Sequence, residues 1–96
     1  MRPLTVDLND PNGRPYFLWD EDVSVGELRQ ALAEGSEHER QRLAGKLLRE
    51  ARDVDVWAFL TPAAVAALLP VLGRRLGRRE RFWKFLIEGW RSDGLL

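Results

Sequence analysis

Residues 24–50, SVGELRQALAEGSEHERQRLAGKLLRE, contain two helix patterns in direct succession. Ser24 with Glu27, and Ser36 with Glu39, have the spacing of a capping box, in which the serine oxygen accepts the third backbone N–H and the glutamate returns to the serine N–H. After each box, leucines and other apolar residues recur at the spacing of one helix face. A single glycine separates the two patterns, so we expect two helices with a short connection.

The sequence after residue 50 predicts two further short helices. An aspartate of residues 53–55 can cap the first of them. Thr61 and Pro62 mark the start of the second, and Gly73 stands just beyond its expected end. Pro70 is expected to kink this helix or to end it early, because proline supplies no N–H to the helix interior.

A last helix is predicted at about residues 78–90. Its expected core face comprises Phe82, Phe85, Leu86, Gly89 and Trp90, at i, i+3, i+4, i+7 and i+8. This orientation leaves Trp83 and Ile87 on a flank, where we expect a partner-binding surface. The alternative is that the core extends that far around the helix. In the same orientation Gly89→Leu would overpack the core.

The N-terminal residues 1–13 are interrupted by Pro3, Pro11 and Gly13, and we expect an irregular arm there. Residues 14–19, RPYFLW, are expected to be extended and to lie across the helices without a strand partner. Their aromatic side chains are the expected anchors: Tyr16, Phe17 or Trp19. The prediction is therefore an all-α bundle of about five helices, as a single domain of residues 14–96 that follows this arm.

The composition is that of an ordinary globular protein. The chain has 96 residues, of which 45% are hydrophobic and 31% charged, and it has no cysteine. The absence of cysteine excludes disulfides and thiolate chemistry and favours a cytoplasmic location. Residues 56–73 lack any formal charge, but two prolines within them favour short buried helices over a membrane span.

No group of residues has the pattern of an active site. His38 is the sole histidine and lacks further ligands at helical spacing other than carboxylates. Ser24 and Ser36 are needed as caps and have no base within reach along their helices. The acidic residues 20–22 could hold magnesium, but they are explained more simply by the positive N-terminus of the helix that follows. We therefore predict no catalytic residue, no metal, no cofactor and no enzyme activity.

The arginines of residues 74–81, RRLGRRER, are the strongest polar feature of the chain. Residues 1–70 contain 8 basic and 12 acidic residues, whereas residues 71–96 contain 7 basic and 3 acidic ones, so net charges of −4 and +4 balance. The guanidinium groups can pair with the acidic part of the chain or with an acidic partner protein. Contacts with nucleic-acid phosphates are the alternative, although the adjoining helix is rich in Phe and Trp rather than in base-reading residues.

Three segments together resemble a known family: PYFLWDED, LLREARDVDVW with FLT following, and LGRRERFWKFLIEGWRSDGLL. The resemblance, over residues 14–96, is to small uncharacterised bacterial proteins whose genes often lie beside an AbiEii-like nucleotidyltransferase, the toxin-type enzyme of two-gene abortive-infection systems. It implies a toxin–antitoxin context, in which this chain is an antitoxin-like accessory and the partner performs the nucleotide chemistry. The chain itself lacks the paired aspartates and the glycine-serine motif of such an enzyme.

The sequence thus predicts a non-enzymatic protein-interaction module. Its expected partner-binding residues are Trp83, Ile87, Arg74, Arg75, Arg78 and Arg79. The alternative is a nucleic-acid-binding regulator that uses the four arginines alone.

Overall fold

The computed structural model describes residues 2–96, which form five α-helices, two 3-10 helices and one pair of very short strands. In chain order the elements are β1 (Leu4–Thr5), β2 (Arg14–Pro15), η1 (Tyr16–Leu18), α1 (Val25–Glu34), α2 (Glu37–Glu50), α3 (Asp53–Val56), α4 (Pro62–Leu72), η2 (Gly73–Leu76) and α5 (Arg79–Ser92). The predicted all-α bundle of five helices is confirmed.

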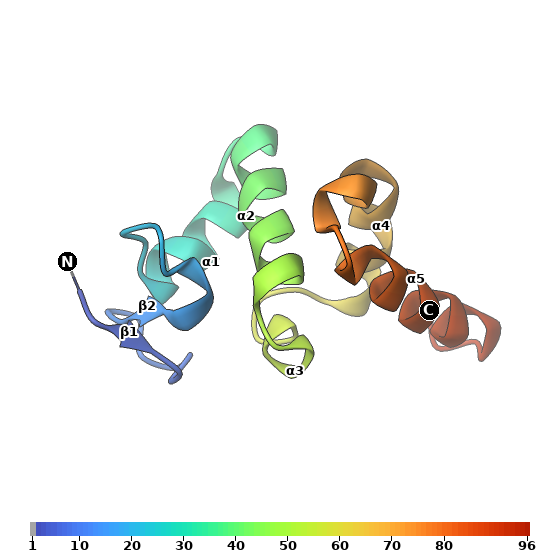
Figure 1. The fold of residues 1–96 in the computed structure, drawn as a ribbon, viewed down its shortest axis with the longest axis horizontal. Helices are drawn as coiled ribbons and strands as arrows, with labels where there is room; N and C mark the ends of the chain where they lie inside the picture. Colours follow the sequence, from blue (N-terminus) through green and yellow to red (C-terminus); the bar gives the residue numbers. More distant parts are fainter. Residues whose placement is uncertain (1) are drawn as a thin grey trace.

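Helix α2 lies in the middle of the molecule, with the N-terminal arm and α1 on one side and with α4 and α5 on the other (Figure 1). Its leucines Leu43, Leu47 and Leu48 are at most 1% exposed and form the centre of the core. Each neighbouring element contributes apolar side chains to the same cluster, among them Leu28 of α1 and Val65 of α4.

The predicted N-terminal caps are present at three helices. Ser24 and Glu27 form the complete capping box of α1, while Ser36 at α2 and Thr61 at α4 accept the expected backbone N–H groups. No aspartate caps α3, because its N-cap position is Arg52 and no side chain bonds there. Of the two outcomes expected at Pro70, the early end of the helix does not occur, because α4 continues past Pro70 to Leu72.

The N-terminal arm is more ordered than the sequence suggested. Leu4–Thr5 and Arg14–Pro15 pair as parallel strands, so the expectation that residues 14–19 have no strand partner is wrong. Gly13 is required at this pairing, since a Cβ atom there would lie 2.6 Å from Thr5 Cγ2. Only the first part of the RPYFLW segment is extended, and the rest is the 3-10 helix η1.

Two side chains hold the arm against the helices. Phe17 of η1 is 2% exposed and is the most deeply buried of the three expected aromatic anchors, whereas Trp19 is 63% exposed. Arg14 is 7% exposed, and its guanidinium donates to the backbone carbonyls of Arg2 at 2.6 Å and of Glu21 at 3.1 Å. The Arg14 guanidinium therefore joins the arm to the loop before α1. These hydrogen bonds are stabilising, because a buried polar group without a partner would lose its bonds to water and gain none in return.

Helix α5 has a different orientation from the predicted one. Trp83 is fully buried and Ile87 is 2% exposed, while Phe85 is 79% exposed and Gly89 has no heavy atom within 4 Å of its Cβ position. The core stripe is shifted by one residue, which rotates the helix by about 100°. Its members, at i, i+3, i+4 and i+7, are Trp83, Leu86, Ile87 and Trp90.

Candidate functional site

The segment that joins α4 to α5 presents several arginines at the surface. Leu72 and Leu76, which are at most 1% exposed, anchor this segment in the core. Arg49 of α2 also donates to the carbonyl oxygen of Arg75 at 3.1 Å. Two glycines make the chain reverse here: Gly73 has φ 26° and Gly77 has φ 56°, conformations that other residues rarely adopt. The backbone of this segment is therefore held firmly while its charged side chains point outward.

The structure divides the arginines of residues 74–81 into separate groups. Arg74 and Arg75 line one hollow together with Lys84, whereas Arg78 and Arg81 line another beside Gly77. Arg79 belongs to neither group. Its guanidinium carbon lies 4.9 Å from the centre of the Phe82 ring and 5.5 Å from that of Trp83, in cation–π contact.

None of the arginines at 74, 75, 78, 79 and 81 forms an ion pair with another described residue. The acidic residues of the first part of the chain pair instead with Arg2, Arg42, Lys46 and Arg52. Intramolecular pairing of the arginine segment with the acidic part, which the sequence left open, is therefore not what this structure contains. The basic charge of this region stays available at the surface.

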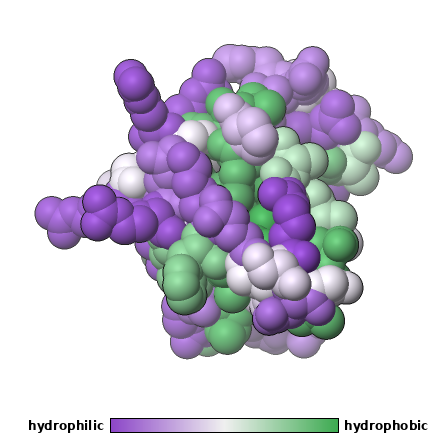
Figure 2. Space-filling view, turned by 90° about the vertical axis from the view of Figure 1, so that its right-hand side faces the viewer, coloured by the Kyte–Doolittle hydropathy of each residue, from purple (hydrophilic) through white to green (hydrophobic). Residues whose placement is uncertain are grey.

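Two phenylalanines of α5 are exposed beside these arginines. Phe85 is 79% exposed and Phe82 is 38% exposed, and both lie on one face of α5 with Arg78, Arg81 and Gly89. We call these five residues the α5 stripe. Figure 2 views the molecule from the end formed by α4 and α5, and on this face green apolar side chains lie between purple hydrophilic ones.

Trp83 and Ile87, the two apolar residues that the sequence assigned to partner binding, do not reach the surface. The indole N–H of Trp83 donates to the carbonyl oxygen of Leu48 at 2.8 Å in the core, and its ring packs edge-on against Trp57 with centres 5.7 Å apart. Both side chains are buried, so the predicted binding flank is wrong and the alternative is correct: the core extends around the helix to include them.

The other groups considered from the sequence have structural partners or are exposed. Lys46 bonds to Asp20 at 2.5 Å and to Glu21 at 2.6 Å. The Lys46 ammonium lowers the pKa of Asp20, and the Arg42 guanidinium lowers that of Glu21. Within residues 2–96 no three His, Asp or Glu side chains gather closely enough to hold a metal ion, and His38 is exposed.

Phe82 and Phe85 were not expected at the surface, because the predicted orientation of α5 placed them in the core. One observation could have prevented this. The chosen core face included Gly89, which has no side chain to bury, whereas the face one residue further along is apolar at all four positions.

Comparison with protein-family models, with curated proteins and with solved structures returned no match. The resemblance to small bacterial proteins whose genes often lie beside a nucleotidyltransferase gene therefore stays a prediction. No helix within the described residues is both long and apolar enough to span a membrane.

Proposed function

We propose that this chain is a non-enzymatic, cytoplasmic binding module that contacts an acidic partner protein through the α5 stripe. A single observation supports the proposal most: Phe85, the most exposed large apolar side chain of the described residues, lies one turn from Arg81 and two turns from Arg78 on the same face of α5, and neither arginine has an acidic partner among those residues. Exposed aromatic residues and arginine are the types that contribute most binding energy in protein interfaces.

The chemistry of the stripe fits an amphipathic helix that bears carboxylates. Phe82 and Phe85 supply apolar area, and Gly89 leaves room for a partner backbone to approach, since nothing lies within 4 Å of its Cβ position. Arginine binds carboxylates through two parallel hydrogen bonds, so Arg78 and Arg81 would fix the register of the partner. The resemblance stated above makes a nucleotidyltransferase the first partner to test, with this chain as its antitoxin-like accessory.

Nucleic acid is the second candidate, and one observation favours it. Exposed phenylalanines beside unpaired arginines also provide stacking surfaces for unpaired bases next to phosphate contacts. Against it stands the charge of the whole chain, which is zero, because a long polyanion would also meet the acidic part of the surface.

A photo-crosslinking experiment separates the two candidates. Phe85 is replaced by a benzophenone derivative of phenylalanine, and Val54, which is 67% exposed on α3, receives the same group as a control. We expect a nuclease-resistant product of higher mass at position 85 that is absent at position 54 and is lost on Arg78→Glu but not on Arg91→Glu. Arg91 lies on another face of α5, so its reversal matches the charge change without touching the stripe.

Two results would overturn the proposal. Equal labelling at positions 85 and 54 would mean that the stripe has no specific partner. A nuclease-sensitive product at position 85 would establish the nucleic-acid candidate in its place. Co-expression with an AbiEii-like nucleotidyltransferase then tests the partner's identity, since co-purification should fail for Phe85→Ser and persist for Arg91→Glu.

A further inference from the structure

Helix α4 is apolar on every side, and part of it is exposed. Its sequence, PAAVAALLPVL, has no charged or hydrogen-bonding side chain. Val65, Leu69 and Leu72 pack into the core, but Ala67 is exposed and Val71 is 52% exposed. A helix that is apolar all round is normally buried all round, because only a polar face gains from contact with water. The outer face of α4 therefore lacks the covering that its composition requires.

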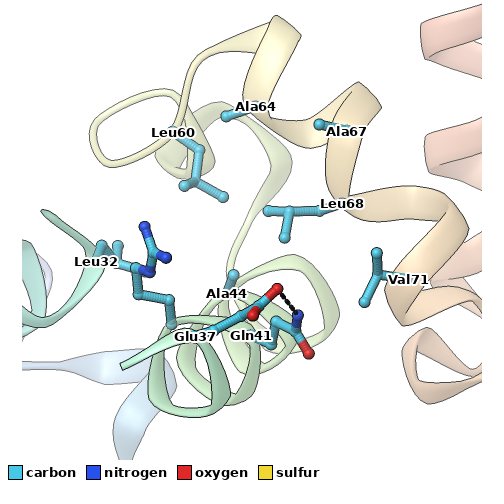
Figure 3. Close-up of a pocket in the computed structure, with 10 residues that line it drawn as sticks. Leu32, Glu37, Gln41, Ala44, Leu60, Ala64, Ala67, Leu68 and Val71 are labelled. Carbon is cyan, nitrogen blue, oxygen red and sulfur yellow. Dashed lines mark hydrogen bonds between the residues drawn. The ribbon is translucent and has the colours of Figure 1, made fainter. Parts of the chain in front are cut away.

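This outer face forms one wall of a groove whose other wall is α2. Figure 3 shows Ala64, Ala67, Leu68 and Val71 of α4 facing the side chains of α2 across an open space. The cavity measures about 350 Å³ and its lining is mostly apolar. Alanines along the wall permit a neighbouring backbone to come close, as small residues do in helix contacts.

The rim of the groove contains one acidic and one basic residue, three positions apart on α2. The Glu37 carboxylate receives only a 3.3 Å hydrogen bond from the Gln41 amide, and Arg40 forms no ion pair within residues 2–96. On the same helix, by contrast, Arg42 and Lys46 are both paired with carboxylates. A rim with one charge of each sign has no net charge, so it offers little attraction to a strongly charged partner. It is complementary in charge to the same rim on a second copy of this chain.

We propose that two copies of this chain associate across a two-fold axis through the outer face of α4 and the α2–α4 groove. In a two-fold pairing each residue meets its counterpart reciprocally. Glu37 of one copy then lies opposite Arg40 of the other, twice, while the exposed residues Ala67 and Val71 of each copy pack against the groove of the other. Both rim charges and the unpaired apolar face of α4 receive partners in a single arrangement.

The required area is compatible with the size of the chain. A standard interface buries about 800 Å² on each partner, and the whole chain exposes 5998 Å². About one seventh of the surface would suffice. This pairing does not depend on the proposed function, because the α5 stripe lies on a different helix and is left accessible in the pair, so that the dimer presents two stripes.

The first test is the mass of the protein in solution, measured by sedimentation over a series of concentrations. We expect wild type to form a species of twice 11.1 kDa. Val71→Glu should raise the dimer dissociation constant by roughly tenfold or more, because two like charges meet in an apolar contact. Val54→Glu makes the same change at an exposed valine on α3 and should leave the dimer unchanged.

The second test uses the rim charges and depends on the two-fold pairing. Glu37→Arg alone and Arg40→Glu alone should each weaken self-association, because like charges then face each other. An equimolar mixture of the two variants should associate more tightly than either, since each basic pair meets an acidic pair. A chain with both changes should dimerise like wild type.

The proposal fails if wild type stays monomeric up to its solubility limit. It also fails if Val71→Glu dimerises as tightly as Val54→Glu, which would place the dimer contact elsewhere. Absence of rescue in the mixture would overturn the reciprocal Glu37–Arg40 pairing. Circular dichroism of each variant verifies that the fold is intact, which is expected because all the substituted side chains are exposed.

Discussion

Replacement of Trp83 by phenylalanine removes the one side-chain donor that the structure places on the carbonyl oxygen of Leu48. The Trp83 indole is fully buried and bonds to that oxygen at 2.8 Å. A carbonyl that loses its partner in the core costs about 1–3 kcal/mol, because no water replaces the lost bond. The smaller ring also leaves a cavity. At about 24 cal/mol per Å³, a void of roughly 40 Å³ adds about 1 kcal/mol.

We therefore expect Trp83→Phe to lower the free energy of unfolding by about 2–4 kcal/mol. For a domain of this size each kcal/mol corresponds to roughly 4–8 °C, so the Tm should fall by at least about 8 °C. Urea unfolding followed by far-UV circular dichroism measures the loss. Trp90→Phe is the matched control, because Trp90 is only partly buried and no hydrogen bond of its indole N–H is found within the described residues.

The reasoning fails if Trp83→Phe costs no more than Trp90→Phe. That result would mean that the indole N–H contributes nothing at Leu48, or that Trp83 lies on the surface as the sequence first suggested. The expected loss of stability also has a practical consequence: a Trp83 variant reports on folding, so it is unsuitable as a probe of partner binding.

Three further predictions concern stability. Gly89→Ala should stabilise α5 by about 0.5–1 kcal/mol in urea unfolding, because the new methyl group meets no heavy atom within 4 Å; destabilisation would return Gly89 to the core. The backbone N–H of Ser24 and the Arg2 guanidinium lower the pKa of Glu27 from 4.5 to about 2, so its contribution is complete above pH 4.5 and is lost as the pH falls towards 2. Melts of Glu27→Gln should accordingly show a lower Tm at pH 7 and a weaker dependence on pH between those values, and an unchanged dependence would contradict this. Arg14→Met should cost about 1–3 kcal/mol in urea unfolding, because it leaves two partly buried carbonyls without donors. A change below about 0.5 kcal/mol, the range of ordinary surface substitutions, would show that the guanidinium does not hold the arm.

The helices that begin with a local hydrogen bond were the most predictable part of the fold. Ser24, Ser36 and Thr61 each bond to a backbone N–H three residues away, so the information lies within a few residues of sequence. The parallel pairing of Leu4–Thr5 with Arg14–Pro15 was not predictable in this way. Strands of two residues have no period, and their partner is ten residues distant.

The orientation of α5 shows where periodicity alone fails. Two apolar stripes run along this helix, one with Phe82 and Phe85 and one with Trp83 and Ile87, and both have helical spacing. Tertiary contacts decide between them, because only the second stripe places an indole N–H beside the free carbonyl of Leu48. Because the helix is rotated from its predicted orientation, the side chains at its exposed face differ from those predicted. Of the two arginines of the α5 stripe, Arg78 was among the predicted partner-binding residues and Arg81 was not, and the predicted apolar members, Trp83 and Ile87, were replaced by Phe82 and Phe85.

The C-terminal turn of α2 is closed by one side chain from each end of the fold. Trp83 of α5 donates to the carbonyl oxygen of Leu48, and the Tyr16 hydroxyl of η1 accepts the N–H of Arg52 at 2.9 Å while it donates to Asp55 at 2.5 Å. These two contacts span 35 and 36 residues of chain. Neither terminal segment can detach without exposing the same turn of the central helix. Amide hydrogens there should consequently exchange with solvent when either terminal segment detaches, so that their exchange reports on the weaker of the two attachments.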